Sequence, residues 1–185
     1  MIQLEDLTKT FGTPKRLVVA ADKINMTVPT GDPIVRELTA LRGLDLVLAA
    51  AVVAEVGDFA RFENPRRLMS YFGLVPGEFS SGSSIRPRGI TKAGSSDVRA
   101  LLFEAAWLYR LKPKVGQWSP FRQKDLSQVA KDIAWKAQLR LYGRYQRLTQ
   151  VRHKRSQVAV TAVARELVGF IWAIARNAEG GMAVR

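Results

Sequence analysis

Apolar residues recur at helical spacing through most of this chain, and this pattern limits the fold more than any other feature. The recurring sets are Leu38, Leu41, Leu44, Leu48 and Val52; Val98, Leu101, Leu102, Ala105 and Leu108; Ala130, Ile133, Ala137, Leu141 and Tyr145; and Ala159, Val163, Leu167, Phe170 and Ile174. Residues three and four positions apart share one face of an α-helix, so each set forms an apolar stripe. The sequence therefore predicts a mainly α fold.

Proline, serine and glycine mark where these helices begin and end. The expected helices, in chain order, run from Pro33 to Gly57, from about Pro65 to Phe72, from Ser95 or Ser96 to a point before Pro113, from Pro120 or Leu126 to about Leu148, and from about Ser156 to Asn177. Pro65 occupies a first-turn position, where its missing N–H costs nothing, and Asp97 lies in a first turn, where the helix dipole favours an anion. Gly180 and Gly181 lie just beyond the last helix, as is typical of a helix end.

Two stretches depart from the helical pattern. Residues 1–33 contain short β-type runs, Leu17 to Ala20 and Ile24 to Val28, that Gly and Pro interrupt. Residues 74–95 hold five Gly and Pro before Ile90 and a cluster of Ser, a composition that resists both a helix and a regular central strand. We therefore expect a short β-type segment at 1–33, a helical domain at 34–177 that contains an irregular Ser/Gly/Arg loop with edge strands at most, and a tail at 178–185.

Positive charge is concentrated in one segment. The net charge of the chain is +13, and residues 110–155 carry 13 basic and 2 acidic residues. Such a field attracts polyanions, among which nucleic acid is the commonest. No acidic residue occurs between 133 and 165, so we expect nothing internal to neutralise this segment. The sequence predicts phosphate contacts by a helix stripe and the residues after it, with a solvated helix face as the alternative; the residues are Lys136, Arg140, Arg144, Arg147, Arg152, Lys154 and Arg155.

Composition excludes several kinds of chemistry. The chain has no Cys and only one His, His153, so it forms no disulfide and no two-histidine zinc motif. It has no Gly-Lys pair, which a Walker A loop requires. The longest apolar run, Leu44 to Val56, is too short to span a membrane, and no secretory signal precedes it. We expect a cytoplasmic protein with no membrane contact and no metal site of its own.

A serine cluster in the irregular loop is the candidate for covalent chemistry. Ser80 and Ser81 stand beside Gly82, and the cations Arg86, Arg88 and Lys92 follow. A hydroxyl attacks phosphorus only if its proton is removed and fixed donors meet the charge that grows on the phosphoryl oxygens. The cations supply the donors but no general base. A flexible surface connection is the alternative interpretation, and residues 92–95 could also offer backbone N–H groups to a phosphate.

The chain from about Ile34 to Ile174 resembles the serine-bearing C-terminal domain of bacterial insertion-sequence transposases of the IS110/IS116/IS902 family. The blocks that carry the resemblance, in order, are LTALRGLDLVLAAAVVAEVGDFARFENPRRLMSYFGLVP, EFSSGSSIRPRGITKAGSSDVRALLFEAAW, DIAWKAQLRLYGRY and AVARELVGFIWAIAR. The resemblance implies a DNA recombinase that uses a guide RNA and bonds a serine to a DNA 5′ phosphate. Ser81 matches that nucleophile, and Ser80 stays as the alternative because the serine is doubled.

The resemblance also implies what this sequence does not contain. The family has an N-terminal RuvC-like domain whose acidic residues bind Mg²⁺, and no counterpart of it occurs here. Residues 1–32 instead resemble the opening of an ABC-type transporter ATPase, up to a point before its phosphate loop. The interpretation of the protein as a transporter subunit would rest on those residues alone.

We therefore expect a truncated transposase that binds DNA, and guide RNA with it, and is catalytically incomplete alone. Its expected partners include a second copy or an intact transposase. The alternative is a non-enzymatic nucleic-acid-binding or interaction protein that modulates an intact transposase.

Overall fold

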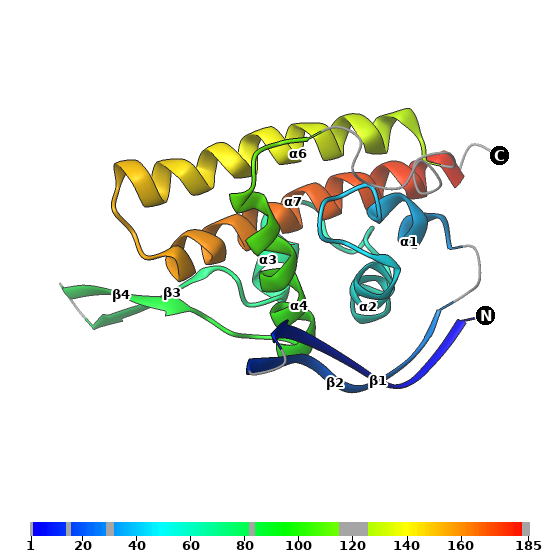
Figure 1. Cartoon of the computed structure of the whole chain (residues 1–185), viewed down its shortest axis with the longest axis horizontal. Helices are drawn as coiled ribbons and strands as arrows, with labels where there is room; N and C mark the ends of the chain where they lie inside the picture. Colours follow the sequence, from blue (N-terminus) through cyan, green and yellow to red (C-terminus); the bar gives the residue numbers. More distant parts are fainter. Residues whose placement is uncertain (1, 14–15, 29–31, 82–83, 115–125, 183–185) are drawn as a thin grey trace.

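The fold is mainly α, as the sequence predicts. The computed structural model describes residues 2–13, 16–28, 32–81, 84–114 and 126–182. The helices are α1 (Pro33–Leu38), α2 (Leu46–Val56), α3 (Pro65–Tyr71), α4 (Ser96–Trp107), α6 (Gln128–Gln146) and α7 (Ser156–Met182), with a 3₁₀ turn η1 (Leu108–Arg110) after α4 and a π-helical turn η2 (Arg147–Val151) after α6. Two antiparallel hairpins complete the described part: β1 (Ile2–Thr13) with β2 (Arg16–Val28), and β3 (Pro76–Ser81) with β4 (Ser84–Ile90) (Figure 1).

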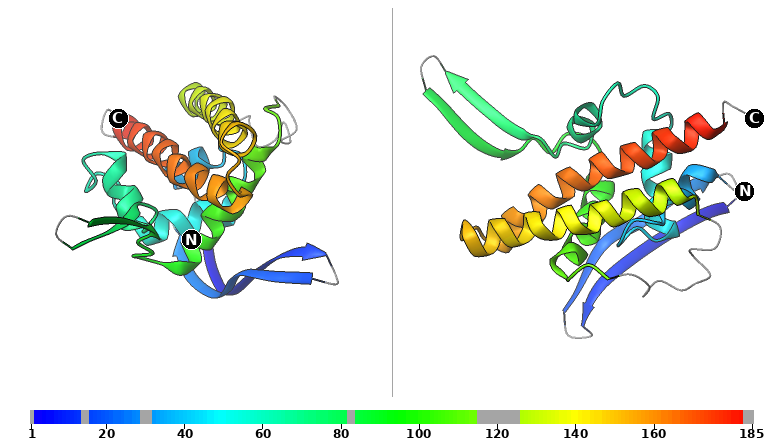
Figure 2. Two further views of the ribbon diagram at one scale, coloured as in Figure 1. Left: turned by 90° about the vertical axis from the view of Figure 1, so that its left-hand side faces the viewer. Right: turned by 90° about the horizontal axis from the view of Figure 1, so that it is seen from above.

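Helix α7 is the centre of the fold. It packs against α1, α3, α4 and α6, and its Val163, Leu167 and Ile171 have no exposed surface. Helix α6 runs antiparallel beside it (Figures 1 and 2). By length and composition, Ser156–Gly180 of α7 could cross a membrane, a feature that the sequence analysis missed. Burial against four other helices instead makes α7 the core helix of a globular protein.

The first expected helical run is two helices. Helix α1 ends at Leu38 and α2 begins at Leu46, so the expectation of one run to Gly57 is wrong. Gly43 between them has a φ of +86°, and a Cβ built on it would lie 2.8 Å from the Cα of Ala105. The chain therefore turns here to pass close to α4, which only glycine permits. Asp45 then caps α2, its carboxylate accepting the backbone N–H of Leu48 at 2.9 Å.

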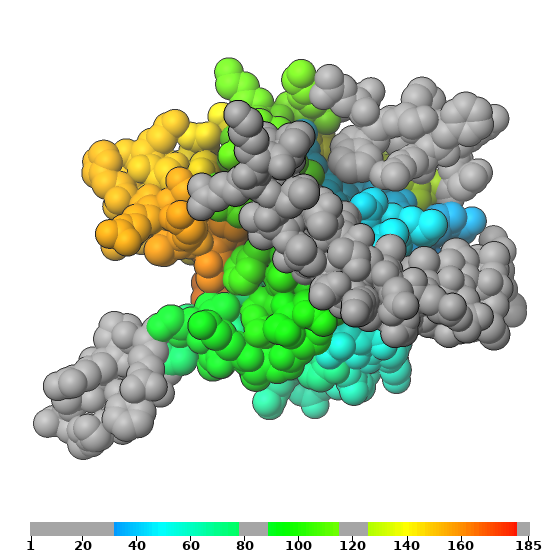
Figure 3. Space-filling view, turned by 60° about the horizontal axis from the view of Figure 1, so that its bottom comes forward, coloured from blue at the N-terminus to red at the C-terminus, as the bar shows by residue number. Residues whose placement is uncertain are grey.

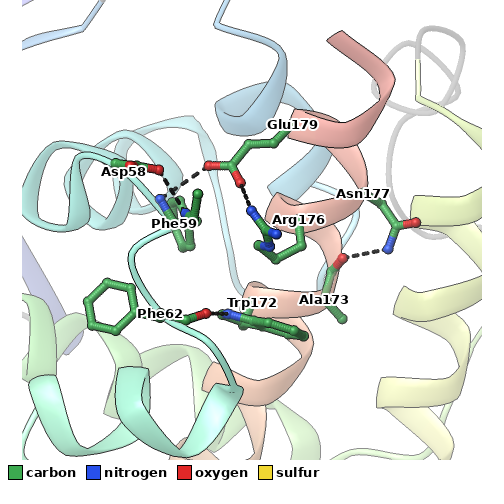
Figure 4. Close-up of polar contacts among 9 residues, drawn as sticks. Asp58, Phe59, Phe62, Trp172, Ala173, Arg176, Asn177 and Glu179 are labelled. Atoms are coloured by element: carbon green, nitrogen blue, oxygen red, sulfur yellow. Dashed lines mark hydrogen bonds and ion pairs between the residues drawn. The ribbon is translucent and has the colours of Figure 1, made fainter. Parts of the chain in front are cut away.

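The last helix runs further than expected. Helix α7 continues through Gly180 and Gly181 to Met182, so the expected end at Asn177 is wrong and residues 178–182 belong to the helix rather than to a tail. Glu179 supports this extension: its Oε1 accepts the backbone N–H of Phe59 at 3.1 Å, and its Oε2 pairs with Arg176 at 2.8 Å (Figure 4). Contacts from a distant part of the chain thus outweigh the helix-ending tendency of glycine.

Other boundaries agree with the sequence. Helix α3 begins at Pro65, and Ser95 caps α4 by accepting the N–H of Val98 at 3.3 Å. Helix α6 begins close to the expected start at Leu126, with Ser127 as N-cap, while the other expected start, Pro120, lies outside the described residues. The buried Glu37 of α1 accepts both the backbone N–H of Ser127, at 3.1 Å, and its hydroxyl, at 2.6 Å. This carboxylate therefore joins α1 to the beginning of α6, which sequence reasoning missed.

Both non-helical stretches form hairpins. The N-terminal one confirms the β-type segment, and its β2 lies beside α2 and α4 (Figure 1). Residues 76–90 form the second, so the expectation of an irregular loop is wrong for the middle of 74–95, and its edge-strand version is right. Among the described residues this sheet has two strands, so each is an edge strand, and β4 can contain Pro87 without losing hydrogen bonds on both sides.

Candidate nucleic-acid interface and serine hairpin

The β3–β4 hairpin carries both candidate nucleophiles near its tip. Ser81 pairs with Ser84, and Phe79 pairs with Arg86. Ser80 pairs with Ile85. The hairpin extends away from the helices (Figure 2). The structure describes the backbone of these residues and of Arg88, while their side-chain contacts lie outside what it describes.

The base of the hairpin is clamped to α4. The buried Arg99 donates one hydrogen bond to the carbonyl of Phe72 at 3.2 Å and another to that of Ala93 at 2.8 Å, so one guanidinium holds both ends. The backbone crosses tightly there, because a Cβ on Gly73 would lie 2.2 Å from the nitrogen of Ala93. The predicted phosphate contact Lys92 is exposed beside this crossing, with a φ of +59°. Sequence reasoning did not single out Arg99.

A second cationic element joins α6 to α7. We name residues 147–155 the basic turn; its exposed cations are Arg147, Arg152, Lys154 and Arg155. None of them forms an ion pair with another described residue. The turn is ordered by its backbone, since the N–H of Lys154 donates to the carbonyl of the buried Leu148 at 2.9 Å. The first turn of α7, which follows, holds no acidic residue.

The predicted stripe along α6 is partly neutralised. Arg140 donates a hydrogen bond from Nε to Glu166 at 3.0 Å, and Nε of Arg144 lies 3.2 Å from the other carboxylate oxygen. The expectation that nothing internal neutralises the stripe is therefore wrong for these two residues. Glu166 of α7 is the first acidic residue after this segment, and the antiparallel packing of the two helices brings it beside α6. Lys136 is exposed and has no ion pair with the described residues.

The serine hairpin and the basic turn lie at the same end of the molecule. Both are on the left in Figure 1, and both face the viewer in the left panel of Figure 2. In Figure 3 the orange surface of the basic turn and the beginning of α7 lies on the same side as the green base of the hairpin. One extended polyanion could therefore contact both elements.

Metal ligands do not gather in the described part of the chain. No three residues among His, Cys, Asp and Glu come together there as a metal site requires. The described residues therefore offer no set of ligands for the Mg²⁺ that the resemblance assigns to the RuvC-like domain.

The shifted pKa values belong to the core. Burial raises the pKa of Tyr109 far above its ordinary value, and the positive charge of Arg42 opposes part of this rise. Burial also lowers the pKa of Arg42, which donates hydrogen bonds to the carbonyls of Leu111, at 3.0 Å, and Lys112, at 3.2 Å. Arg42 thus fastens the segment after α4.

Sequence comparison gives these features of the fold a family context. Residues 35–118 match the sequence profile of the Transposase IS116/IS110/IS902 family. Over these residues the chain is therefore similar to that transposase family, as its motifs predict. The match spans α1 to η1 and includes the whole serine hairpin, while the basic turn lies beyond it.

Individual relatives agree with this assignment. A protein of Sinorhizobium fredii that is named as a transposase, y4qE, is 54% identical over 145 residues, which cover 78% of this chain and 37% of that protein. The transposase for insertion sequence element IS1111A of Coxiella burnetii is 35% identical over 71 residues, 38% of this chain and 20% of that protein. The chain thus spans about a third or less of the length of these relatives. The family match begins at residue 35, so the likeness of residues 1–32 to a transporter ATPase stays a prediction.

Proposed function

We propose that this chain acts in insertion-sequence transposition by binding DNA with its basic turn and presenting a serine on its hairpin. The observation that carries the proposal is the set of four exposed cations, unpaired with any described residue, at the same end of the molecule as the hairpin. Structured guide RNA presents the same phosphates, and we propose that it shares this surface. A cytoplasmic location is part of the proposal.

The position of the cations favours a bound anion over simple solvation. The N-terminus of a helix carries about half a positive charge, and a cation beside it costs the fold about 0.3–1 kcal/mol. Lys154 and Arg155 directly precede α7, so they add to that positive charge instead of opposing it. A phosphate at the turn would offset this repulsion, and release of its counterions would drive binding.

The serine step is an exchange of phosphodiester bonds. The hydroxyl oxygen of Ser81 attacks a DNA phosphorus, an Oγ–P bond forms, the P–O3′ bond breaks, and the serine proton ends on the 3′ oxygen. One ester replaces another, so the step needs no energy source. We propose that Arg86, on the neighbouring strand of the hairpin, stabilises the charge on the phosphoryl oxygens. We propose that an intact transposase supplies the group that activates the serine, and that this chain alone is catalytically incomplete.

A salt titration tests the DNA-binding part. We expect Arg152→Gln/Lys154→Gln to reduce the slope of log affinity against log salt by about two units on duplex DNA, since each lost phosphate contact is worth about 0.9. Arg36→Gln/Lys131→Gln is the matched control, because it removes two positive charges, one in the last turn of α1 and one near the beginning of α6, away from the basic turn. Equal slopes for both double variants would refute the role of the basic turn. Repeating the titration with a structured RNA tests the shared surface.

Covalent trapping tests the serine step. With nicked donor DNA and a full-length family member, we expect an adduct of this chain with DNA that Ser81→Ala abolishes and Ser80→Ala retains. The reverse pattern would move the nucleophile to Ser80. An adduct formed by this chain alone would refute its incompleteness, and association with the full-length protein without any adduct would favour the modulator alternative.

A further inference from the structure

A pocket of ≈ 590 Å³ opens at the base of the serine hairpin. Its walls are residues 61–63, residues 93–94, and Arg67, Ser70 and Tyr71 of α3. Tyr71 comes shortly before β3, and residues 93–94 come shortly after β4. A DNA strand bound by the hairpin would therefore pass this pocket before it reached the helices.

Arg61 lies over aromatic rings in this pocket. Its guanidinium carbon is 4.7 Å from the ring centre of Phe62 and 4.8 Å from that of Tyr71, and the residue is exposed. The two rings meet edge to face, with 5.4 Å between their centres. The hydroxyl of Tyr71 donates to the carbonyl of Glu55 at 3.0 Å, which fixes its ring. A guanidinium held over aromatic rings offers a surface on which a nucleobase can stack.

The pocket wall is preorganised by α7. Trp172 donates a hydrogen bond from its indole nitrogen to the carbonyl of Phe62 at 3.0 Å, and Glu179 holds the N–H of Phe59 (Figure 4). The segment that carries Arg61 is therefore attached to the core helix at two points. A site that is ordered before its ligand arrives loses little entropy on binding.

The charges in the pocket match a nucleotide better than a bare phosphate. Arg67 and Ser70 are exposed, stand one helical turn apart on α3 and could hold a phosphate together. Glu63 also lines the pocket, and its carboxylate would repel a free phosphate. The same carboxylate can accept a hydrogen bond from the amino group of a base. A phosphate site, a stacking surface and an acceptor together correspond to the parts of one nucleotide.

We propose that this pocket binds one unpaired nucleotide of a DNA strand, with its phosphate on Arg67 and Ser70 and its base on Arg61. The inference rests on the proposed DNA-binding function and adds a preference for single-stranded or nicked DNA. In a duplex each base is stacked and paired, so it reaches the pocket only after unstacking, which costs a few kcal/mol. The pocket is separate from the basic turn, so the two sites can fail independently.

The test compares a fluorescent single-stranded 12-mer DNA with its duplex, using three variants in the pocket region. Arg61→Lys keeps the charge and removes the planar group, so we expect single-strand affinity to fall about fivefold or more, the effect of one lost base stack. Arg67→Gln should reduce the single-strand salt slope by about 0.7. Arg66→Gln is the control, because Arg66 is exposed on the same helix and does not line the pocket.

Each outcome decides between the two proposals. If Arg61→Lys and Arg67→Gln bind single-stranded DNA like Arg66→Gln while Arg152→Gln/Lys154→Gln loses affinity, the pocket inference is overturned and the proposed function stands. If the native chain binds neither DNA, both are overturned. A 2-aminopurine base in the 12-mer gives a second readout, since stacking on Arg61 should quench its fluorescence and Arg61→Lys should restore it. Thermal unfolding by circular dichroism shows that each variant is folded.

Discussion

Arg99 of α4 donates a hydrogen bond of 2.8 Å to the carbonyl of Ala93, and this contact fixes the chain where it leaves the serine hairpin. The same guanidinium holds the carbonyl of Phe72 on the other side of the hairpin. A side chain buried in the helical body thus fixes the base of a hairpin that extends away from it.

Replacing Arg99, which holds the base of the hairpin, should destabilise the protein. We expect Arg99→Ala to lower the free energy of unfolding by about 2–4 kcal/mol, because two carbonyls lose a charged donor in a buried place. Urea unfolding measures the loss. Arg99→Lys keeps the charge but loses the planar fork, so it should recover only part of the stability. An Arg99→Ala protein as stable as the native one would contradict the clamp.

Removing the acid that neutralises the α6 stripe should strengthen DNA binding. Glu166→Gln frees Arg140 and Arg144, so we expect tighter binding and a salt slope steeper by about one to two units. The cost in stability should be about 1 kcal/mol or less, because the Arg140 side chain is 69% exposed. Fluorescence anisotropy over a range of salt measures the slope. Unchanged affinity in a folded Glu166→Gln protein would show that the stripe does not contact DNA.

The contact between Glu37 and Ser127 should be cooperative. We expect Glu37→Leu to cost about 2–3 kcal/mol, since it leaves the N–H of Ser127 without its acceptor. Ser127→Ala should cost about 1 kcal/mol as a lost helix cap. The double variant should be less destabilised than the sum, and a double-mutant cycle from urea unfolding measures the difference. Additive losses would show that the two residues act independently.

Two glycines with similar φ angles should differ in how much an alanine destabilises the protein. Gly73 has a φ of +64° and would place a Cβ 2.2 Å from backbone, whereas Gly57 has a φ of +68° and open space around it. We expect Gly57→Ala to cost about 1 kcal/mol from backbone strain alone. Gly73→Ala should cost distinctly more, because the backbone at Ala93 must also move. Thermal unfolding of the two variants compares them, and equal losses would refute the close crossing.

Local patterns predicted the helices, and contacts between distant residues decided the exceptions. Most residues of the stripes around Leu101, Leu141 and Leu167 are buried or partly buried as their spacing predicts, whereas Leu108 is exposed. The split at Gly43 depends on the approach of Ala105, 62 positions away. The apolar spacing within the first helical run gives no indication of that contact.

The candidate site shows the same limit. Ser81 and the cations of the basic turn could be named from composition and motifs. The pairing of Arg140 and Arg144 with Glu166 could not, because it depends on how α6 and α7 lie against each other. Arg61 gave no signal in sequence, since its stacking requires Tyr71 to return from α3 to the same place.

The length of β3 has a consequence for how the family chemistry would be controlled. Six residues at about 3.3 Å each give the strand a reach of roughly 20 Å. A nucleophile on an arm of this length would act beyond the surface of its own molecule, in a cleft that another molecule provides. Strand breakage would then begin only after assembly, which would safeguard host DNA from an unaccompanied copy of this chain.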